Sequence, residues 1–283
     1  MKGWLIYSKK DAEKNRDYID IYFEDGRELG IDFELIYTEE LEIGVKNGEL
    51  YILRYGKTVE KPDFAICRTI YPLLTRQLEL LGIKVYNNSK TAVICNDKAL
   101  CLQYVSQTGV PVLDSAFRKC GLESEFCSYG FPLVSKPVSG RSGIGVSLAR
   151  NASELYENSS TYNEDWVLQP LCKSPGKDLR VFVVGKEIVG AILRSSDRDF
   201  RANYCLGGSA KVYVLSEKER EYVMKIVNIF DFGMVGVDFL FDGKNGLLFS
   251  EIEDVVGART LYRFTDIDIV KKYLEFIKND LRQ

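Results

Sequence analysis

The sequence predicts a mixed α/β (α+β) protein in which a small strand–helix domain is followed by antiparallel hairpins. Over residues 1–90, short apolar runs alternate with polar, helix-compatible segments, a pattern that favours a small α/β sheet. From Phe131 onward, apolar runs come in pairs joined by turns rich in Gly, Asn or Asp, which supply the positive φ angles of hairpins. At 283 residues the chain is long enough for roughly two lobes.

Two helices are expected in the first part of the chain, one of them including Thr75–Leu81. The other is expected over Asn96–Gln107, because Asn96 is a good N-cap residue and Gly109 follows the end of the segment. Pro111 then favours an extended exit. The expected strands are Trp4–Tyr7, Phe33–Tyr37, Leu50–Leu53, Phe64–Cys67 and Lys84–Tyr86.

The second part is expected to combine hairpins with two further helices. Ser216 and Glu219 form a capping box ahead of one apolar stripe, and a second stripe runs from Val270 to Leu281. Residues Ser195–Gly208 read as a long polar loop, which is either mobile or functional. The expected hairpins pair Pro132–Pro137 with Gly145–Ala149, Leu179–Val184 with Ile188–Leu193, and Val235–Phe241 with Leu247–Glu253.

Composition excludes several classes of function. The chain has no histidine, which removes Ser-His-Asp and Cys-His nucleophile systems and every His-containing metal site. The net charge of −3 shows no basic excess, so we expect neither a nucleic-acid partner nor a membrane surface. Seven cysteines without a CxxC pair, together with a first apolar run too short for a signal peptide, predict a cytoplasmic protein with reduced thiols.

A glycine-rich loop follows the strand that contains Lys136. Gly140, Gly143 and Ser142 let backbone N–H groups approach a phosphate, and Lys136 and Arg141 add positive charge. The loop is neither a Walker A loop nor a dinucleotide fingerprint, because strand residues follow it. The alternative interpretation is a plain hairpin turn.

Three carboxylates are expected on one face of the last hairpin. Glu251 and Glu253 share a face of their strand, and a four-residue turn that sets Asp242 opposite Leu247 places Asp238 opposite Glu251. Like charges this close favour a cation between them, and oxygen ligands suit Mg²⁺ or Mn²⁺. The alternative is a solvated acidic face. The apolar side chains expected on the opposite face are Val237, Phe239, Phe241, Leu248 and Ile252.

Two further polar segments are candidates for a binding site. Asp178 and Arg180 alternate onto one face at the start of a strand, where Asp can accept from sugar hydroxyls and Arg can meet phosphate. The loop that begins at Arg194 contains Arg201 and Asn203 and reads as an anion clamp. The alternatives are an ordinary ion pair and a solvated loop. Lys98, in the first turn of its helix, is either solvated or a phosphate ligand.

The order of these motifs over residues 90–260 resembles the ATP-grasp superfamily, and most closely the RimK-type carboxylate–amine ligases. Gln169-Pro170-Leu171 stands where the adenine-binding hinge of the family is expected. The other matching segments are Asn96-Asp97-Lys98, Pro132–Gly145, Gly176–Gly185, Asp199–Asn203 with Gly207-Gly208, Gly236-Val237-Asp238 and Glu251-Ile252-Glu253.

The resemblance implies an ATP-grasp fold with an N-terminal domain over residues 1–90 and two antiparallel-sheet subdomains, 91–176 and 177–283, that hold ATP between them. It also implies Mg²⁺ or Mn²⁺ at Asp238, Glu251 and Glu253. Arg201, Arg194 and Asn203 would neutralise the transferring phosphate. The residues implied to bind ATP are Lys98, Lys136, Gly140, Ser142, Gly143, Gln169, Pro170, Leu171, Asp178 and Arg180.

The implied activity is ATP-dependent joining of a carboxylate to an amine through an acyl-phosphate, with small-molecule or peptide substrates and with release of ADP and phosphate. The alternatives are an ATP-grasp phosphotransferase and a non-catalytic ATP-binding module. Two departures from the family pattern stand out: Glu253 replaces the usual Asn, and residues 254–260 replace a short Ser-Pro-Gly turn. Arg259, in that segment, becomes a candidate contact for a substrate carboxylate. The sequence leaves the oligomeric state open, a homo-oligomer included.

Overall fold

The computed structural model describes most of the chain. The described residues are 1–121, 128–140, 143–197, 199–201, 208–243 and 246–282. Within these ranges, every helix is too short or too polar to cross a bilayer.

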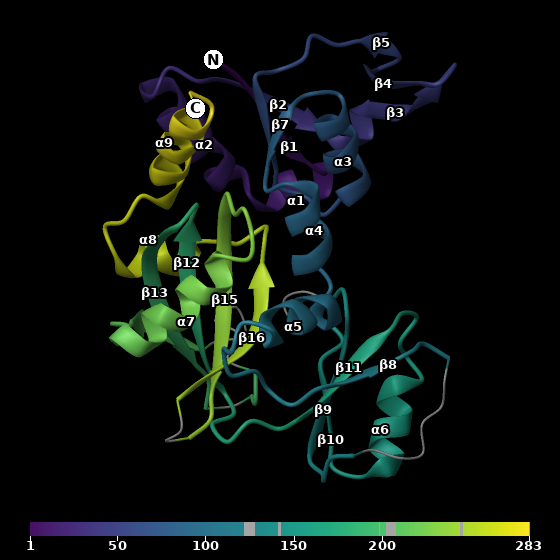
Figure 1. Cartoon of the computed structure of the whole chain (residues 1–283), viewed down its shortest axis with the longest axis vertical. Coiled ribbons are helices and arrows are strands. Elements are labelled where there is room, and N and C mark those ends of the chain that lie inside the picture. The colour runs from purple at the N-terminus through teal and green to yellow at the C-terminus, as the bar shows by residue number, and fades with distance from the viewer. Residues whose placement is uncertain (122–127, 141–142, 198, 202–207, 244–245, 283) are drawn as a thin grey trace.

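A parallel sheet in the order β2-β1-β6-β7 forms the N-terminal part (Figure 1). The chain adds β2 on one side of β1 and β6 on the other, so the direction of strand addition reverses between β1 and β6. The strand β1 is buried on both faces, which explains its continuous apolar sequence. The elements are β1 (Lys2–Tyr7), α1 (Lys9–Lys14), α2 (Arg16–Glu28), β2 (Asp32–Tyr37), β6 (Phe64–Cys67), α3 (Pro72–Leu80) and β7 (Lys84–Tyr86).

A small antiparallel sheet extends from the N-terminal part, at the upper right of Figure 1. It consists of β3 (Leu41–Lys46), β4 (Glu49–Arg54) and β5 (Lys57–Thr58), and the short 3-10 helix η1 (Thr38–Glu40) precedes it. The Gln77 side chain of α3 donates to the carbonyl oxygens of Gly44 and Tyr51, which fastens this sheet to the rest of the domain.

The middle of the chain forms an antiparallel sheet in the order β10-β9-β11-β8, covered by one helix (Figure 1). Two helices lead into it from the N-terminal part. The elements are α4 (Ser89–Cys95), α5 (Lys98–Ser106), β8 (Ala116–Arg118), β9 (Leu133–Pro137), β10 (Ser147–Ala149), α6 (Ala152–Ser159) and β11 (Trp166–Pro170).

The last part of the chain forms another antiparallel sheet, in the order β14-β13-β12-β15-β16. The predicted capping box is present, since Ser216 and Glu219 bond reciprocally at the start of α7. The elements are β12 (Lys177–Val184), β13 (Glu187–Ser195), β14 (Ser209–Val212), α7 (Glu217–Val227), β15 (Met234–Phe241), β16 (Leu247–Glu253), α8 (Arg259–Phe264) and α9 (Ile269–Asp280).

The C-terminal helix α9 lies beside α2 of the N-terminal part (Figure 1). One hydrophobic cluster contains Leu5 and Tyr22 from the start of the chain together with Tyr273 and Leu274 from its end. The first and last of the three predicted domains therefore share one hydrophobic core. The division at residues 90 and 176 stays a prediction.

Two details differ from the sequence-based expectations. The predicted helix over Asn96–Gln107 is α5, but its N-cap is Asp97, whose side chain accepts from the Leu100 amide, while Asn96 ends α4. The last hairpin pairs Phe241, not Asp242, with Leu247.

A β-bulge restores the predicted pairing at the carboxylates. The register of β15 against β16 shifts between Asp238 and Phe239, which brings Asp238 opposite Glu251. The same shift turns Phe249, rather than Leu248, into the core beside Phe239. The expected alignment of Asp238 with Glu251 is thus confirmed, but it depends on the bulge, which the length of the turn does not predict.

Candidate active site

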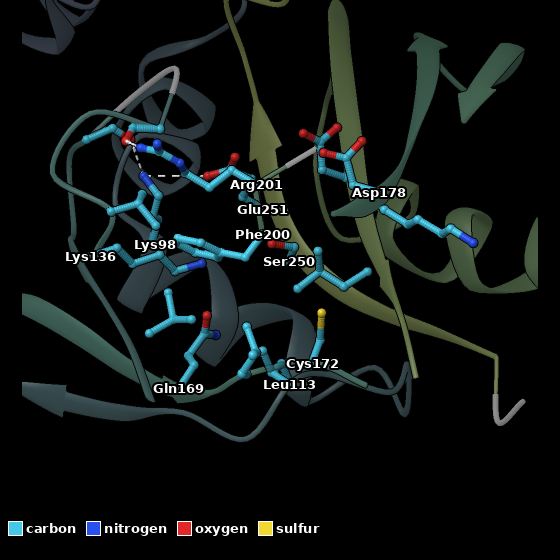
Figure 2. Close-up of a pocket in the computed structure, with 18 of the residues that line it drawn as sticks. Lys98, Leu113, Lys136, Gln169, Cys172, Asp178, Phe200, Arg201, Ser250 and Glu251 are labelled. Atoms are coloured by element: carbon cyan, nitrogen blue, oxygen red, sulfur yellow. Dashed lines mark hydrogen bonds and ion pairs between the residues drawn. The ribbon is translucent and has the colours of Figure 1, made fainter. Parts of the chain in front are cut away.

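One cavity lies between the sheet that contains β9 and β11 and the sheet that contains β12 and β15, and it gathers most of the residues singled out by sequence (Figure 2). Ser142 and Asn203 lie outside the described residues. The predicted residues that line the cavity are Lys98, Lys136, Gly140, Gly143, Gln169, Pro170, Leu171, Asp178, Arg180, Arg194, Arg201, Asp238, Glu251 and Glu253.

The structure does not bring Arg259 to this cavity. Arg259 begins α8, and its guanidinium donates to the carbonyl oxygen of Lys14 at 3.1 Å. The segment that replaces the Ser-Pro-Gly turn packs toward the N-terminal domain, because Val256 and Ala258 are buried in the core shared with that domain.

Sequence reasoning missed several lining residues, most of them apolar. Such residues have no signature in a sequence, because their burial in a cavity looks like burial in a core. Phe200 and Lys177 directly neighbour residues of the recognised motifs, so their position in the sequence could have identified them. The missed residues are Leu113, Val134, Val146, Cys172, Lys177, Phe200, Leu240 and Ser250.

The two ends of the cavity differ in chemistry. Figure 2 shows Gln169, Leu113 and Cys172 at one end, with Lys98, Arg201 and Glu251 at the other and Phe200 between them. At the first end, Gln169 is 2% exposed and its amide donates to the Ser115 hydroxyl. Leu113 and Cys172 line the same end, so the cavity offers a mostly apolar slot that opens into a charged region.

Lys98 is held at the charged end by the start of α5. The Asp97 cap sets the helix N-terminus, and the Lys98 amide donates to the Val138 carbonyl oxygen at 3.0 Å. The Lys98 ammonium donates to the carbonyl oxygen of Gly140 and lies 3.5 Å from a carboxylate oxygen of Glu251. Lys98 thus links the glycine-rich loop to the last hairpin.

Lys136 projects into the cavity from β9 and is 7% exposed. Burial lowers the pKa of its ammonium to about 8; the nearby Glu251 carboxylate opposes this shift, and Lys98 adds to it. An anion bound between Lys98 and Lys136 would relieve their repulsion and restore the charge.

Asp238 lies at the centre of a buried ion-pair network. Its two oxygens accept from Nε and Nη2 of Arg180 at 2.8 and 2.6 Å, and Arg194 adds a bond of 3.0 Å. Arg194 also pairs with both oxygens of Asp178, and Arg180 pairs with Glu253 at 2.7 Å. The additional negative charge of Glu253 is therefore matched by Arg180.

The two aspartates of this network differ in pKa. Burial raises the pKa of Asp178 to about 6, although Arg194 opposes the shift. Burial acts on Asp238 in the same direction, but Arg180 and Arg194 together hold its pKa below the usual value. Asp238 therefore stays ionised, whereas Asp178 titrates close to neutral pH.

Asp238, Glu251 and Glu253 could hold a metal ion. Each offers a carboxylate oxygen within 4.8 Å of the other two. A set made only of oxygen ligands fits a hard divalent cation such as Mg²⁺. Ionised carboxylates have lone pairs beyond those used by the arginines and Lys98, so pairing leaves room for a cation.

Arg201 connects the two loops that flank the charged end. Its guanidinium pairs with Asp199 at 2.7 Å and donates to the Gly143 carbonyl oxygen at 3.2 Å. The base of its loop rests on Gly176, whose amide donates to the Phe200 carbonyl oxygen at 2.7 Å. Gly176 has a φ of +73°, and a Cβ there would lie 2.4 Å from the Ser196 oxygen.

Comparison with known proteins agrees with this geometry. Residues 95–277 match the RimK-like ATP-grasp domain family. The glutamate–LysW ligase ArgX of Sulfurisphaera tokodaii is 30% identical, over 81% of this chain and 86% of the relative. A probable alpha-L-glutamate ligase of Trichodesmium erythraeum is 30% identical, over 89% of this chain and 95% of the relative.

A solved structure with the same fold is the VanG D-Ala:D-Ser ligase of Enterococcus faecalis, with a TM-score of 0.77 and 17% identity over 98% of each chain. The predicted ATP-grasp fold is thereby confirmed. The chain belongs to the RimK-like ATP-grasp family of ATP-dependent carboxylate–amine ligases.

Proposed function

We propose that this enzyme activates a substrate carboxylate as an acyl-phosphate and passes the acyl group to an amine. A carboxylate oxygen attacks the γ-phosphorus of ATP, and ADP leaves with the electrons of the broken P–O bond. The amine nitrogen then attacks the acyl carbon, phosphate departs, and the nitrogen loses a proton. The observation that carries the proposal is the meeting of Lys98, Lys136 and Arg201 with three carboxylates at one end of a cavity whose other end is apolar.

The nucleotide fits the two ends of the cavity. The adenine would lie in the apolar slot against the backbone of Gln169–Leu171, and Asp178 would accept from the ribose hydroxyls. Lys98 and Lys136 would contact the phosphates, with Arg180 contributing charge from the far wall. Gly140, Ser142 and Gly143 would cover the phosphates with backbone N–H groups.

Asp238, Glu251 and Glu253 would hold Mg²⁺ or Mn²⁺ next to the phosphates. When bound, such an ion supplies positive charge that offsets the charge of the transferring phosphoryl group. Arg201 and Arg194, together with Asn203, would add positive charge that neutralises the same group. Phosphoryl transfer depends on positioning and charge and requires no imidazole, so a chain without histidine can carry it out.

The names of the relatives support a substrate class. One is a glutamate–LysW ligase and the other a probable alpha-L-glutamate ligase. We therefore propose that the amine substrate is an amino acid, with L-glutamate the first to test. The activated carboxylate would belong to a small molecule, a peptide or a protein partner.

Product analysis tests the proposal. The enzyme is incubated with ATP, Mg²⁺, L-glutamate and pools of peptides, and ADP, free phosphate and amide products are measured. Peptide carboxylates labelled with oxygen-18 should pass one labelled oxygen to the released phosphate. A stable phosphorylated product without free phosphate would identify a phosphotransferase instead. Tight ATP binding without turnover on any pool would identify a binding module.

A further inference from the structure

In the part of the chain that the structure describes, a buried guanidinium outside the nucleotide cavity has no anionic partner. Arg68 follows β6 and is 6% exposed, as deeply buried as Arg180 and Arg194. Each of those arginines pairs with two carboxylates. Among the described residues, no carboxylate oxygen lies within 4.0 Å of the Arg68 guanidinium, and its Nη2 donates to the Val256 carbonyl oxygen at 2.8 Å.

Further hydrogen-bond donors gather around this charge. Burial opposes the charged form of Arg68, yet nearby Tyr22, Tyr7 and Tyr18 raise its pKa, and its guanidinium lies 5.2 Å from the ring centroid of Tyr18. The hydroxyl oxygens of Tyr7 and Tyr22 and the Nε of Arg68 are buried and unpaired within the described part of the chain. Buried polar groups are normally satisfied, so this set of donors calls for an acceptor.

The position in the fold is one where ligands bind. Tyr7 ends β1 and Arg68 directly follows β6, the two neighbouring strands between which strand addition reverses. In open parallel sheets, ligands bind outside the carboxyl ends of the strands at this switch point. Val256, which accepts from Arg68, comes three residues after Glu253 of the nucleotide cavity. Arg68 is therefore bonded to the segment that directly follows the last hairpin.

We propose that Arg68, Tyr7 and Tyr22 form a subsite for a carboxylate of the amine substrate, one that does not itself react. A guanidinium fork flanked by two hydroxyls matches the two oxygens of a carboxylate, and such a partner compensates the buried charge. The amine substrate is then an amino acid with a free carboxylate rather than a neutral amine. This assignment rests on the proposed ligase reaction.

Thermal unfolding tests the subsite without knowledge of the substrate. Melting temperatures are measured in sodium acetate and in sodium chloride at matched ionic strength, with the nucleotide cavity filled by Mg²⁺ and AMP-PNP. The wild type should gain stability from acetate relative to chloride, and Arg68→Met should lose that gain. Arg259→Met is the matched control, since Arg259 also donates to a backbone carbonyl but is exposed, and it should keep the gain.

Tyr7→Phe keeps the charge and removes one donor, so it should reduce the acetate gain even where Arg68→Met proves too unstable to measure. An equal gain in wild type, Arg68→Met and Tyr7→Phe would overturn the subsite, as would no gain in the wild type. Loss of the gain in Arg259→Met alone would move the carboxylate site to Arg259. A failure of AMP-PNP to stabilise the wild type would instead count against the proposed function.

Kinetics provide the second readout. For an amino acid accepted as amine substrate, Arg68→Met and Tyr7→Phe should raise its KM, about 10- to 100-fold for the arginine variant, with kcat changed much less. The preference of the wild type for the free amino acid over its carboxamide should shrink in both variants. An unchanged preference would contradict a carboxylate contact and leave Arg68 with a structural role only.

Discussion

Arg180 and Asp238 stand directly opposite each other on β12 and β15 and share two parallel hydrogen bonds, of 2.8 and 2.6 Å. Strand register thus places a buried cation against a predicted metal ligand. Both side chains are less than a tenth exposed, and Arg194 shares the same carboxylate. Asp238 therefore holds two arginines in place in addition to any contact with a metal.

Asp238→Asn should lower both turnover and stability. The substitution leaves Arg180 and Arg194 buried with less negative charge, and breaking a buried ion pair costs about 3–5 kcal/mol. If Asp238 were only a metal ligand, the substitution would change the free energy of unfolding little. Because Asp238 also pairs with two buried arginines, we expect a large decrease instead. Chemical denaturation measures the loss.

Glu251→Gln is the matched control, because Glu251 is more exposed and its ion pair with Lys98 is longer, at 3.5 Å. Turnover should fall by orders of magnitude with little change in the free energy of unfolding. Near-normal activity in both variants would show that the metal binds elsewhere.

The value of kcat/KM for ATP should fall on both sides of neutrality. Asp178 has its pKa raised to about 6, so below that pH it becomes protonated and loses acceptor capacity for the ribose. Lys136 has its pKa lowered to about 8, so above that pH it loses the charge that attracts phosphate. A profile measured across both values, with Lys136→Arg expected to move only the alkaline limb, checks the assignment.

The pKa shifts of Lys136 and Asp178 make the free energy of unfolding depend on pH in opposite directions. Between about 8 and its ordinary value of 10.5, Lys136 is neutral when folded and charged when unfolded, so its contribution to stability rises with pH. Between its ordinary 3.8 and about 6, Asp178 binds its proton more tightly when folded, so its contribution falls as pH rises. Activity that followed these stability trends would argue against roles in nucleotide binding.

Gly176→Ala should reduce kcat by about 10- to 100-fold, because a misplaced loop misplaces Arg201. The added Cβ would meet the Ser196 oxygen at 2.4 Å and the Asp199 oxygen at 2.9 Å. Gly56→Ala is a matched control: Gly56 has the same φ of +73° but nothing within 4 Å of its Cβ position. Steady-state turnover compares the two, and equal losses would mean that backbone strain rather than contact is responsible.

Glu253→Asn should raise the Mg²⁺ concentration required for half-maximal turnover. The change removes one negative charge from the carboxylate set and frees Nη1 of Arg180, while the Arg180–Asp238 pair stays in place. Titration of turnover with Mg²⁺ at saturating ATP measures the effect. An unchanged titration would exclude Glu253 as a ligand.

Strands and site residues could be predicted from the sequence where a local hydrophobic pattern or the order of motifs determines them. The hairpin that carries Asp238 and Glu251, and the loop around Arg201, fall in this class. The prediction failed where a distant segment decides the outcome. Arg259 turned toward Lys14 because residues 256–258 complete a core whose other half is N-terminal.

The partners of the buried ion pairs could not be predicted from the sequence either. The pairs Arg180–Asp238 and Arg194–Asp178 follow from the register of three strands, and no single strand reveals that register. The orphan charge of Arg68 was equally invisible, because a sequence does not show which charges a fold leaves without a partner.

The placement of α9 beside α2 has a consequence for synthesis on the ribosome. Leu5 and Tyr22 are made before the rest of their cluster, because Tyr273 and Leu274, which complete it, follow much later in the chain. Domains commonly fold in the order of their translation. Here the sheet that contains β1 waits for α9, so its α2 face stays uncovered in the nascent chain until α9 has been made.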